Sequence, residues 1–342
     1  MTNSISSNST PNTAVYLLGA GFSACITGGQ LPLMAGFFDN LSPEEFPTLY
    51  DFVHAYGGDV AMANVEKVIG WLDQLSEAPL TDAGDADKWR RDEPEIRLQL
   101  GHYTLKRLYP ANFQPDHWGV CVLASADEQT TVITTNYDNL AERILSNKIS
   151  ATHGGSNPNC HHCRMRRILL HDCECNESSP GAQPDWRGSV LKLHGSIAWK
   201  TCSNRLCRQF RCLVAECDCR PTDDFQCPCC GKKCESVLVL PSQHKHYKQY
   251  PHLSRIWDSA QKALLDAKWW LVFGFSLPDS DHWVQWLIRK ALASGRVERI
   301  SIIDINPESV ARRFKQLQAT GSAVNVETFT VPSGDSHPTW LG

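Results

Sequence analysis

Short, mostly apolar runs recur along the chain, and each is closed or followed by glycine or polar residues. The runs are 14–18, 131–134, 190–193, 270–273 and 300–305. Continuous apolar runs of this length, without alternation, are typical of parallel strands that are buried on both faces. We therefore predict a parallel sheet whose carboxyl strand ends carry the polar residues.

Helical periodicity separates several of these runs. Apolar residues lie three or four positions apart over 139–145, 283–292 and 307–317, and another helix begins near Phe22. Strand and helix thus alternate, which predicts a doubly wound, Rossmann-like α/β fold that binds its ligand beyond the carboxyl strand ends. Between about 37 and 118 the pattern is mainly helical, and we predict a helical subdomain there.

Composition narrows the class of protein. The 342 residues are 42% hydrophobic and 20% charged, which is ordinary for a globular chain, and the length suggests two domains or one domain with a sizeable insertion. The net charge of -4 gives no general attraction to nucleic acid or to anionic membranes. Residues 1–13 are rich in Ser, Asn and Thr and lack a secretory pattern, so we expect a disordered tail. The longest apolar stretch, 269–277, is about half of the ~20 residues that a membrane span needs, so we expect a soluble, cytoplasmic protein.

Cysteine usage predicts an inserted metal-binding module. Of the 15 cysteines, only Cys25 and Cys121 lie outside the interval from Cys160 to Cys234. Without a secretory signal the compartment is expected to be reducing, where metal ligation explains clustered cysteines better than disulfides do. We assign 151–187 and 201–236 to this Cys-rich insertion.

One zinc site can be predicted from spacing. Cys227 and Cys230, followed by Gly231, form a Cys-x-x-Cys-Gly knuckle that grips one tetrahedral zinc with two thiolates. Cys202 and Cys207 offer the complementary pair. Four protein ligands close the coordination sphere, so the zinc is expected to be structural.

A second zinc is expected in the same module. Its ligands are predicted among Cys160, Cys163, Cys173 and Cys175 or their neighbours, and several tetrads fit the spacing equally well. A competing hypothesis makes the module a zinc ribbon whose arginines contact nucleic acid. Interleaved acidic residues weaken that basic patch, so we do not expect nucleic acid as a partner.

Polar residues follow the first two strands. Gly19, Ala20 and Gly21 form a turn that would let backbone approach a pyrophosphate, but the third glycine of the dinucleotide fingerprint is missing, and an ordinary tight turn explains them equally well. After the second strand come Asn136 and Asp138, which also suit a helix cap.

Three later strands end in similar fashion. His194 and Gly195 follow the third strand, and a structural histidine is the plainer explanation for that pair taken alone. Gly274 and Ser276 follow the fourth strand, and Asn306 follows the fifth. Individually these residues describe turns.

Together, the five elements resemble the sirtuin family. That family has a glycine-alanine-glycine turn, then Asn-x-Asp, His-Gly, Gly-x-Ser and a terminal Asn, in the order found here between Val15 and Asn306. The resemblance implies NAD binding by a domain built from 14–150, 188–200 and 237–342.

The resemblance also implies roles for individual residues. NAD phosphates and the adenosine side would be contacted by Gly19, Ala20, Gly21, Ser23, Thr135, Gly274, Ser276 and Asn306. Asn136 and His194 would flank the nicotinamide ribose, and Asp138 would bind the nicotinamide carboxamide. Breaking the C1′–N bond develops oxocarbenium character, which an amide can help to orient while an imidazole accepts a proton.

The chain departs from the family pattern at positions that bear on which group attacks the ribose. Protein deacylases carry Pro-Asp-Phe-Arg where this chain has 31–34, and glutamine where it has Thr135. Residues 237–246 do not resemble their apolar substrate segment. Leu240, Pro241 and 274–281 instead look like the sirtuin-domain NAD hydrolases of bacterial antiphage defence.

That second resemblance implies hydrolysis of NAD to nicotinamide and ADP-ribose, with protein-lysine deacylation as the alternative and a nucleic-acid-binding zinc ribbon as a second one. A freely active NAD hydrolase would be toxic. The resemblance therefore also implies a separately encoded activator or partner, and a homo-oligomer.

Overall fold

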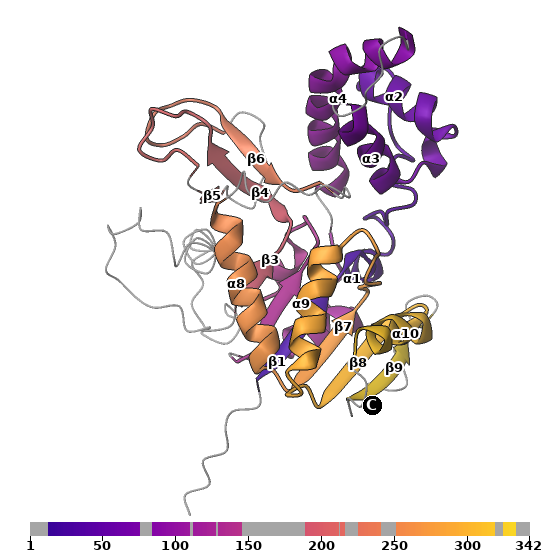
Figure 1. Cartoon of the computed structure of the whole chain (residues 1–342), viewed down its shortest axis with the longest axis vertical. Coiled ribbons are helices and arrows are strands. Elements are labelled where there is room, and N and C mark those ends of the chain that lie inside the picture. The colour runs from indigo at the N-terminus through magenta and orange to yellow at the C-terminus, as the bar shows by residue number, and fades with distance from the viewer. Residues whose placement is uncertain are drawn as a thin grey trace, which may run out of the picture.

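The computed structural model describes the greater part of the chain. The described residues are 13–75, 84–109, 112–127, 129–145, 189–211, 213–215, 225–240, 251–318 and 324–332. They form a six-stranded parallel sheet with helices on both faces, a group of helices beside its carboxyl edge, and a small antiparallel sheet (Figure 1).

The large sheet has the strand order β3-β2-β1-β7-β8-β9, and every neighbouring pair is parallel. Its strands are β1 (Ala14–Leu18), β2 (Thr131–Thr134), β3 (Ser189–Lys192), β7 (Trp269–Phe273), β8 (Arg299–Asp304) and β9 (Asn325–Thr330). Five of the six strands fall on the predicted apolar runs; β3 and β8 lie one residue earlier than predicted, and β7 begins one residue earlier. The order reverses at β1, where a doubly wound sheet places its ligand crevice.

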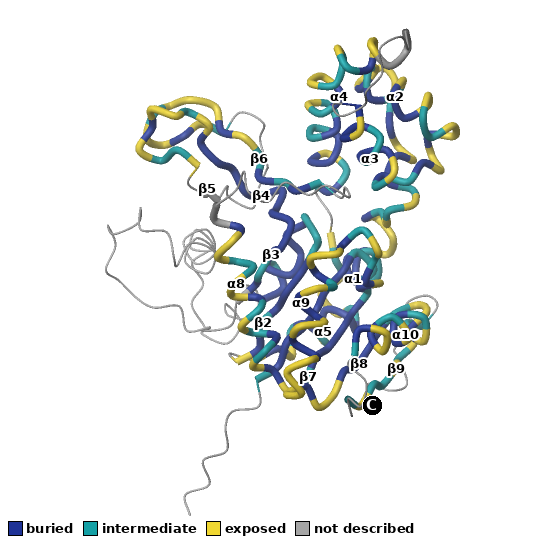
Figure 2. Tube along the Cα trace, viewed as in Figure 1, coloured by how far each residue is buried: buried dark blue, intermediate teal, exposed yellow. Residues whose placement is uncertain are grey.

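Alternate side chains of β1 enter two separate cores. Tyr16 and Leu18 pack beneath α1 (Ala20–Ile26) and α5 (Trp118–Ala124). On the opposite face, Val15 and Leu17 join the helices α8 (Pro251–Asp266), α9 (His282–Ala293) and α10 (Pro307–Leu317). Both faces are covered, so the central strands are buried (Figure 2) and the doubly wound prediction is confirmed.

The helices beside the carboxyl edge have their own core. They are α2 (Pro47–Gly57), the short 3-10 helix η1 (Val60–Met62), α3 (Val65–Leu75) and α4 (Gly84–Leu108). Phe38, Phe52 and Tyr103 are buried in this core, where Phe38 stacks on Tyr103 and Phe52 meets Trp89 edge to face. The expected helical subdomain is therefore present, and Figure 1 shows it beyond the carboxyl end of the sheet.

A small sheet that the apolar pattern did not predict begins at Gly195 and extends into the cysteine-rich insertion. Its antiparallel strands are β4 (Gly195–Cys202), β5 (Leu213–Ala215) and β6 (Cys234–Leu238), in the order β5-β4-β6. β4 begins directly after His194. Gly195 makes the turn with φ of 85°, and a Cβ there would lie 2.1 Å from the Val237 carbonyl oxygen. Glycine is therefore required where the chain leaves the large sheet.

Within the described ranges, every helix is too short or too polar to cross a lipid bilayer.

Candidate functional site

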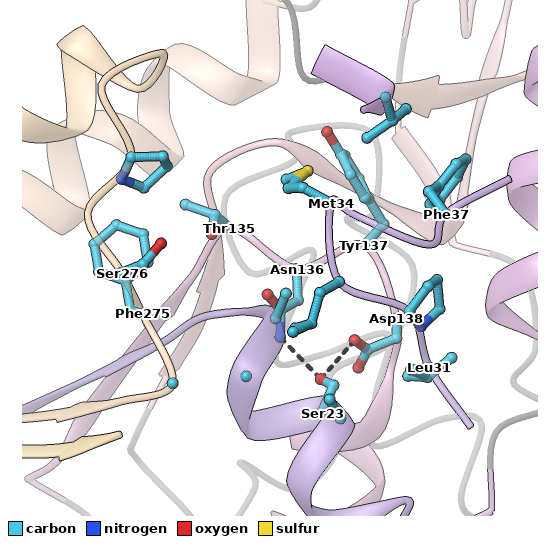
Figure 3. Close-up of a pocket in the computed structure, with 18 of the residues that line it drawn as sticks. Ser23, Leu31, Met34, Phe37, Thr135, Asn136, Tyr137, Asp138, Phe275 and Ser276 are labelled. Carbon is cyan, nitrogen blue, oxygen red and sulfur yellow. Dashed lines mark hydrogen bonds between the residues drawn. The ribbon is translucent and has the colours of Figure 1, made fainter. Parts of the chain in front are cut away.

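A cavity of about 550 Å³ lies at the carboxyl ends of β1, β2 and β7. Its lining comes from four segments that are distant in sequence: the turn after β1, the loop after β2, His194 at the end of β3, and the loop 274–281 after β7. The helical subdomain supplies part of the remaining wall, including Glu66. Parallel strand ends thus bring together most of the residues singled out from the sequence (Figure 3).

Ser23, Asn136 and Asp138 form one hydrogen-bonded network on the cavity wall (Figure 3). The Ser23 hydroxyl donates to Oδ2 of Asp138 at 2.8 Å and accepts from Nδ2 of Asn136 at 2.9 Å. The same Asn136 amide donates to the Gly19 carbonyl at 2.9 Å. The amide nitrogen is therefore held by protein partners, and its orientation is fixed.

Asp138 was considered both as a helix cap and as a residue of the candidate site. Its Oδ1 accepts from the Leu140 amide at 3.0 Å, where a helical segment begins, while Oδ2 accepts from Ser23. The helix-cap interpretation therefore holds for one oxygen. Each carboxylate oxygen has a second lone pair, so contact with a carboxamide stays a proposal.

The glycines of the first turn serve close packing of two loops. A Cβ on Gly19 would lie 2.5 Å from the Gly274 carbonyl oxygen, and one on Gly21 would lie 2.8 Å from the Gly274 Cα. The amide of Gly21 donates to that same Gly274 carbonyl, and the Gly19 amide donates to Phe273. These two amides are thus committed to protein acceptors, so phosphate binding by this turn stays a proposal.

His194 lines the cavity but is buried, with 3% of its surface exposed. Its carbonyl accepts from the Val239 amide at 2.9 Å, and its ring lies 6.2 Å from the Tyr137 ring between centroids. Nε2 lies 3.3 Å from Oδ1 of Asp281, a residue that the sequence analysis did not assign to the site. Asp281 stands at the beginning of α9, where an acidic residue reads only as a helix cap.

The opposite wall is apolar and was missed by motif reasoning. It consists of residues from the segment after α1, from α3 and from α4, among them Leu31, Met34, Phe37, Val65 and Leu108. Cys25 also faces the cavity, and burial raises the pKa of its thiol to about 11. Cys25 is therefore a thiol near neutral pH and not a thiolate nucleophile.

The loop after β7 is held from two sides. Arg313 on α10 donates to the carbonyls of Ser276 and Leu277 at 3.0 and 3.1 Å, and Leu277 has a φ of 53°. A positive φ at leucine is strained, and such strain gathers at functional sites. Ser280 donates a 2.6 Å hydrogen bond to Glu66, which links this loop to the helical subdomain.

The terminal Asn, the last of the five elements that resemble the sirtuin family, lies at the edge of the site. Asn306 caps α10 by accepting from the Ser309 amide, and it is not part of the cavity lining. Asp304 and Ile305, immediately before it, do line the cavity. Thr135, Gly274 and Ser276 line it as well.

A buried ion pair lies beneath the site. Nζ of Lys192, on β3, is 3.0 Å from Oε1 of Glu142, and the two side chains are 0% and 3% exposed. Lys192 also donates to the backbone carbonyl of Asp138. Burial raises the pKa of Glu142 and the Lys192 charge opposes that rise. The pair therefore joins β3 to the segment that carries Asn136 and Asp138.

The four cysteines predicted to bind zinc lie together. The ligand atoms of Cys202, Cys207, Cys227 and Cys230 are all within 4.8 Å of one another. Sγ atoms are 3.7 Å apart in the pairs Cys202–Cys230 and Cys207–Cys227. A tetrahedron with Zn–S bonds of about 2.3 Å has S···S edges of roughly 3.8 Å, so the donor set fits one structural zinc. Cys160, Cys163, Cys173 and Cys175 lie outside the described residues, and the second zinc stays a prediction.

A parallel α/β sheet with a cavity at its strand ends and an inserted four-cysteine cluster defines a sirtuin-like fold. Residues 130–323 match the family model described as a SIR2-like domain. That range covers more than half of the chain, so the chain belongs to the SIR2-like domain family. Binding of NAD is implied by this membership.

Comparison with individual solved structures finds distant similarities. Similar solved structures include a Sir2 enzyme studied for mechanism and regulation, at 15% identity and a TM-score of 0.40, covering 91% of this chain and 88% of that one. A sirtuin structure concerned with substrate affinity has 12% identity and a TM-score of 0.41 over 93% and 88% of the chains. Sir2Tm bound to a propionylated peptide has 11% identity and a TM-score of 0.39 over 93% and 87%. No curated protein sequence matches significantly.

Proposed function

We propose that this chain is a NAD hydrolase that cleaves the bond between nicotinamide and ribose and passes the ribose carbon to water. The observation that carries the proposal is that Asn136 and Asp138, from the end of β2, and His194, from the end of β3, line one cavity of about 550 Å³. In this cleavage an amide can orient the reacting groups, a carboxylate can accept a hydrogen bond from the carboxamide, and an imidazole can accept a proton.

In the proposed reaction each polar group has one task. Asn136, oriented by Ser23 and Gly19, positions the ribose or the attacking water through its amide oxygen. Asp138 accepts a hydrogen bond from the carboxamide of nicotinamide. His194 accepts the proton that water loses as its oxygen bonds to the ribose carbon. Nicotinamide leaves as a neutral group with the electrons of the broken bond, so no strong general acid is needed.

Water is favoured over an acyl-lysine as the acceptor by the sequence departures at 31–34 and at Thr135. Beside His194, the Val239 amide donates to the His194 carbonyl, and the Tyr137 hydroxyl donates to the Val239 carbonyl at 2.6 Å.

The experiment is incubation of the purified chain with NAD and quantification of nicotinamide. Wild-type protein is expected to release nicotinamide, and Asn136→Ala is expected to release about a hundredfold less, because loss of correct positioning of the reacting groups costs about that much. The matched control is Asn40→Ala in the helical subdomain, outside the cavity lining. Full turnover by Asn136→Ala would remove this residue from the mechanism and with it the proposal.

We extend the proposal to a setting of bacterial antiphage defence, with a separately encoded activator and a homo-oligomeric assembly, on the strength of the resemblance at 274–281. Expression in a bacterial host that is then challenged with phage should deplete cellular NAD and reduce phage yield. An Asn136→Ala strain serves as the control. Equal phage yield and equal NAD in the two strains would contradict the extension and leave the hydrolase proposal to the purified assay.

A further inference from the structure

Asp281 occupies a helix-capping position without capping through its side chain. It is the N-cap residue of α9, and its side chain makes no capping hydrogen bond. Aspartate is among the preferred N-cap residues because its carboxylate ordinarily accepts from the N2 or N3 amide. Here Oδ1 lies 3.3 Å from Nε2 of His194, and the two side chains are 6% and 4% exposed. The carboxylate is directed to the imidazole in place of the helix end.

The backbone on both sides of this contact is fixed. The Asp281 amide donates to the Pro278 carbonyl at 3.1 Å, and the Asp281 carbonyl accepts from Gln285 at 2.9 Å. The Leu193 carbonyl, next to His194, accepts from the Trp257 indole at 3.0 Å. The two atoms at 3.3 Å are close but not aligned as a hydrogen bond, as is common for catalytic groups before substrate binds.

We propose that Asp281 is a positioning residue for His194, and its effect on turnover rests on the proposed NAD hydrolysis. The carboxylate accepts the Nε2 hydrogen of the imidazole, which selects one tautomer and leaves the lone pair on Nδ1 as the base. When that base takes the proton of the attacking water, the negative charge of Asp281 stabilises the resulting imidazolium. The proton then leaves to solvent, and Asp281 itself stays ionised.

Other titratable groups face the same cavity and must be separated from Asp281 in a test. They are Cys25, Glu66, Tyr137, Asp138 and Asp304. None of the interactions described above links them to Nε2 of His194, whereas Asp281 lies at 3.3 Å. Asp279, two residues earlier in the same loop, is exposed and lies outside the cavity lining. It therefore provides a matched control with the same change of charge.

The first measurement compares Asp281→Asn with Asp279→Asn and wild type in steady-state nicotinamide release. Asp281→Asn should lower kcat at least about tenfold, since general-base catalysis contributes more than this, with little change of KM for NAD. The acidic limb of its pH profile should move to lower pH, because removal of the carboxylate lowers the pKa of the base. Asp279→Asn should match wild type. A kcat for Asp281→Asn equal to that of wild type would overturn the proposal.

The second measurement needs no activity. The imidazole of His194 is titrated by NMR in 15N-histidine-labelled protein, and its signal among the 13 histidines is assigned with His194→Gln. A carboxylate at this distance should raise the imidazole pKa, so the value in Asp281→Asn should lie at least about one pH unit below wild type. An unchanged pKa would overturn the pairing. If wild type releases no nicotinamide even with any required activator present while the pKa shifts, the proposed function fails and the pairing stands.

Discussion

The Ser23 hydroxyl donates a 2.8 Å hydrogen bond to the Asp138 carboxylate across 115 positions of the chain. Through this bond the first helix after β1 and the loop after β2 hold each other in place, and Ser23 is 2% exposed. The bond explains how a turn and an Asn-x-Asp element that are remote in sequence become one side of a site.

Ser23→Ala should therefore lower nicotinamide release by about tenfold or more, because the loss of a hydrogen bond to a charged group costs about 1.5–3 kcal/mol and frees Asn136 to reorient. The unfolding temperature should fall by only the few degrees that this loss implies. Ser294→Ala, at the exposed end of α9, is the control. Unchanged kinetics for Ser23→Ala would mean that Asn136 is oriented without it.

Zinc should be bound by the four-cysteine cluster at one ion per chain or more. Cys227→Ser should lose one zinc and lower the unfolding temperature of the module, because metal binding supplies folding free energy. Cys229→Ser is the matched control, since Cys229 belongs to the same knuckle but is exposed and outside the cluster. Equal zinc content in the two variants, measured by elemental analysis, would contradict the assignment.

Replacing only one partner of the Lys192–Glu142 ion pair should lower the free energy of unfolding. Lys192→Met leaves a buried carboxylate without its cation and should lower the free energy of unfolding by about 3–5 kcal/mol. The double variant with Glu142→Leu should recover most of that loss. Chemical denaturation of the two single variants and the double variant measures the coupling, and additive effects would show that the two residues act independently.

The same pair predicts a pH dependence. Burial raises the pKa of Glu142 above its ordinary value of 4.5, and Lys192 opposes the rise. A group with a raised folded-state pKa contributes stability below its unfolded pKa and loses it as pH increases through the folded pKa. Without Lys192 the rise is larger, so the deficit of Lys192→Met should shrink as pH falls toward 4.5. A deficit that is constant with pH would exclude an ionised Glu142 as its cause.

Cys25 should be unreactive although it faces the cavity. Burial raises its thiol pKa to about 11, so the reactive thiolate is scarce at neutral pH and its population grows as pH rises toward that value. Alkylation followed by mass spectrometry should modify the exposed Cys121 first. Modification of Cys25 at neutral pH as fast as Cys121 would show that its pKa is not raised.

Local sequence patterns were sufficient to predict five strands of the large sheet. The five apolar runs became parallel strands because continuous burial on both faces leaves a readable signature. β9 (Asn325–Thr330) escaped prediction because its residues are half-buried or exposed. The strands of the small sheet were also missed, since their pairing is set by partners distant in sequence and by the cysteine cluster.

The candidate site was likewise predictable from the sequence only in part. Asn136, Asp138 and His194 could be found because strand ends converge in any doubly wound sheet. Asp281 could not, because its local context is that of a helix cap, and only the path of the loop after β7 brings it to His194. The apolar wall from the helical subdomain also has no motif, because any apolar residues of suitable size would form it.

The most direct test of the central claim is the identity of the product released with nicotinamide. The purified chain is incubated with NAD, with and without an acetylated lysine peptide, and the products are separated by mass spectrometry. If an activator is required, both arms contain it. We predict equal rates of nicotinamide release in the two arms and plain ADP-ribose as the second product. Release that depends strictly on the peptide and yields acetylated ADP-ribose would contradict hydrolysis and identify the chain as a deacylase.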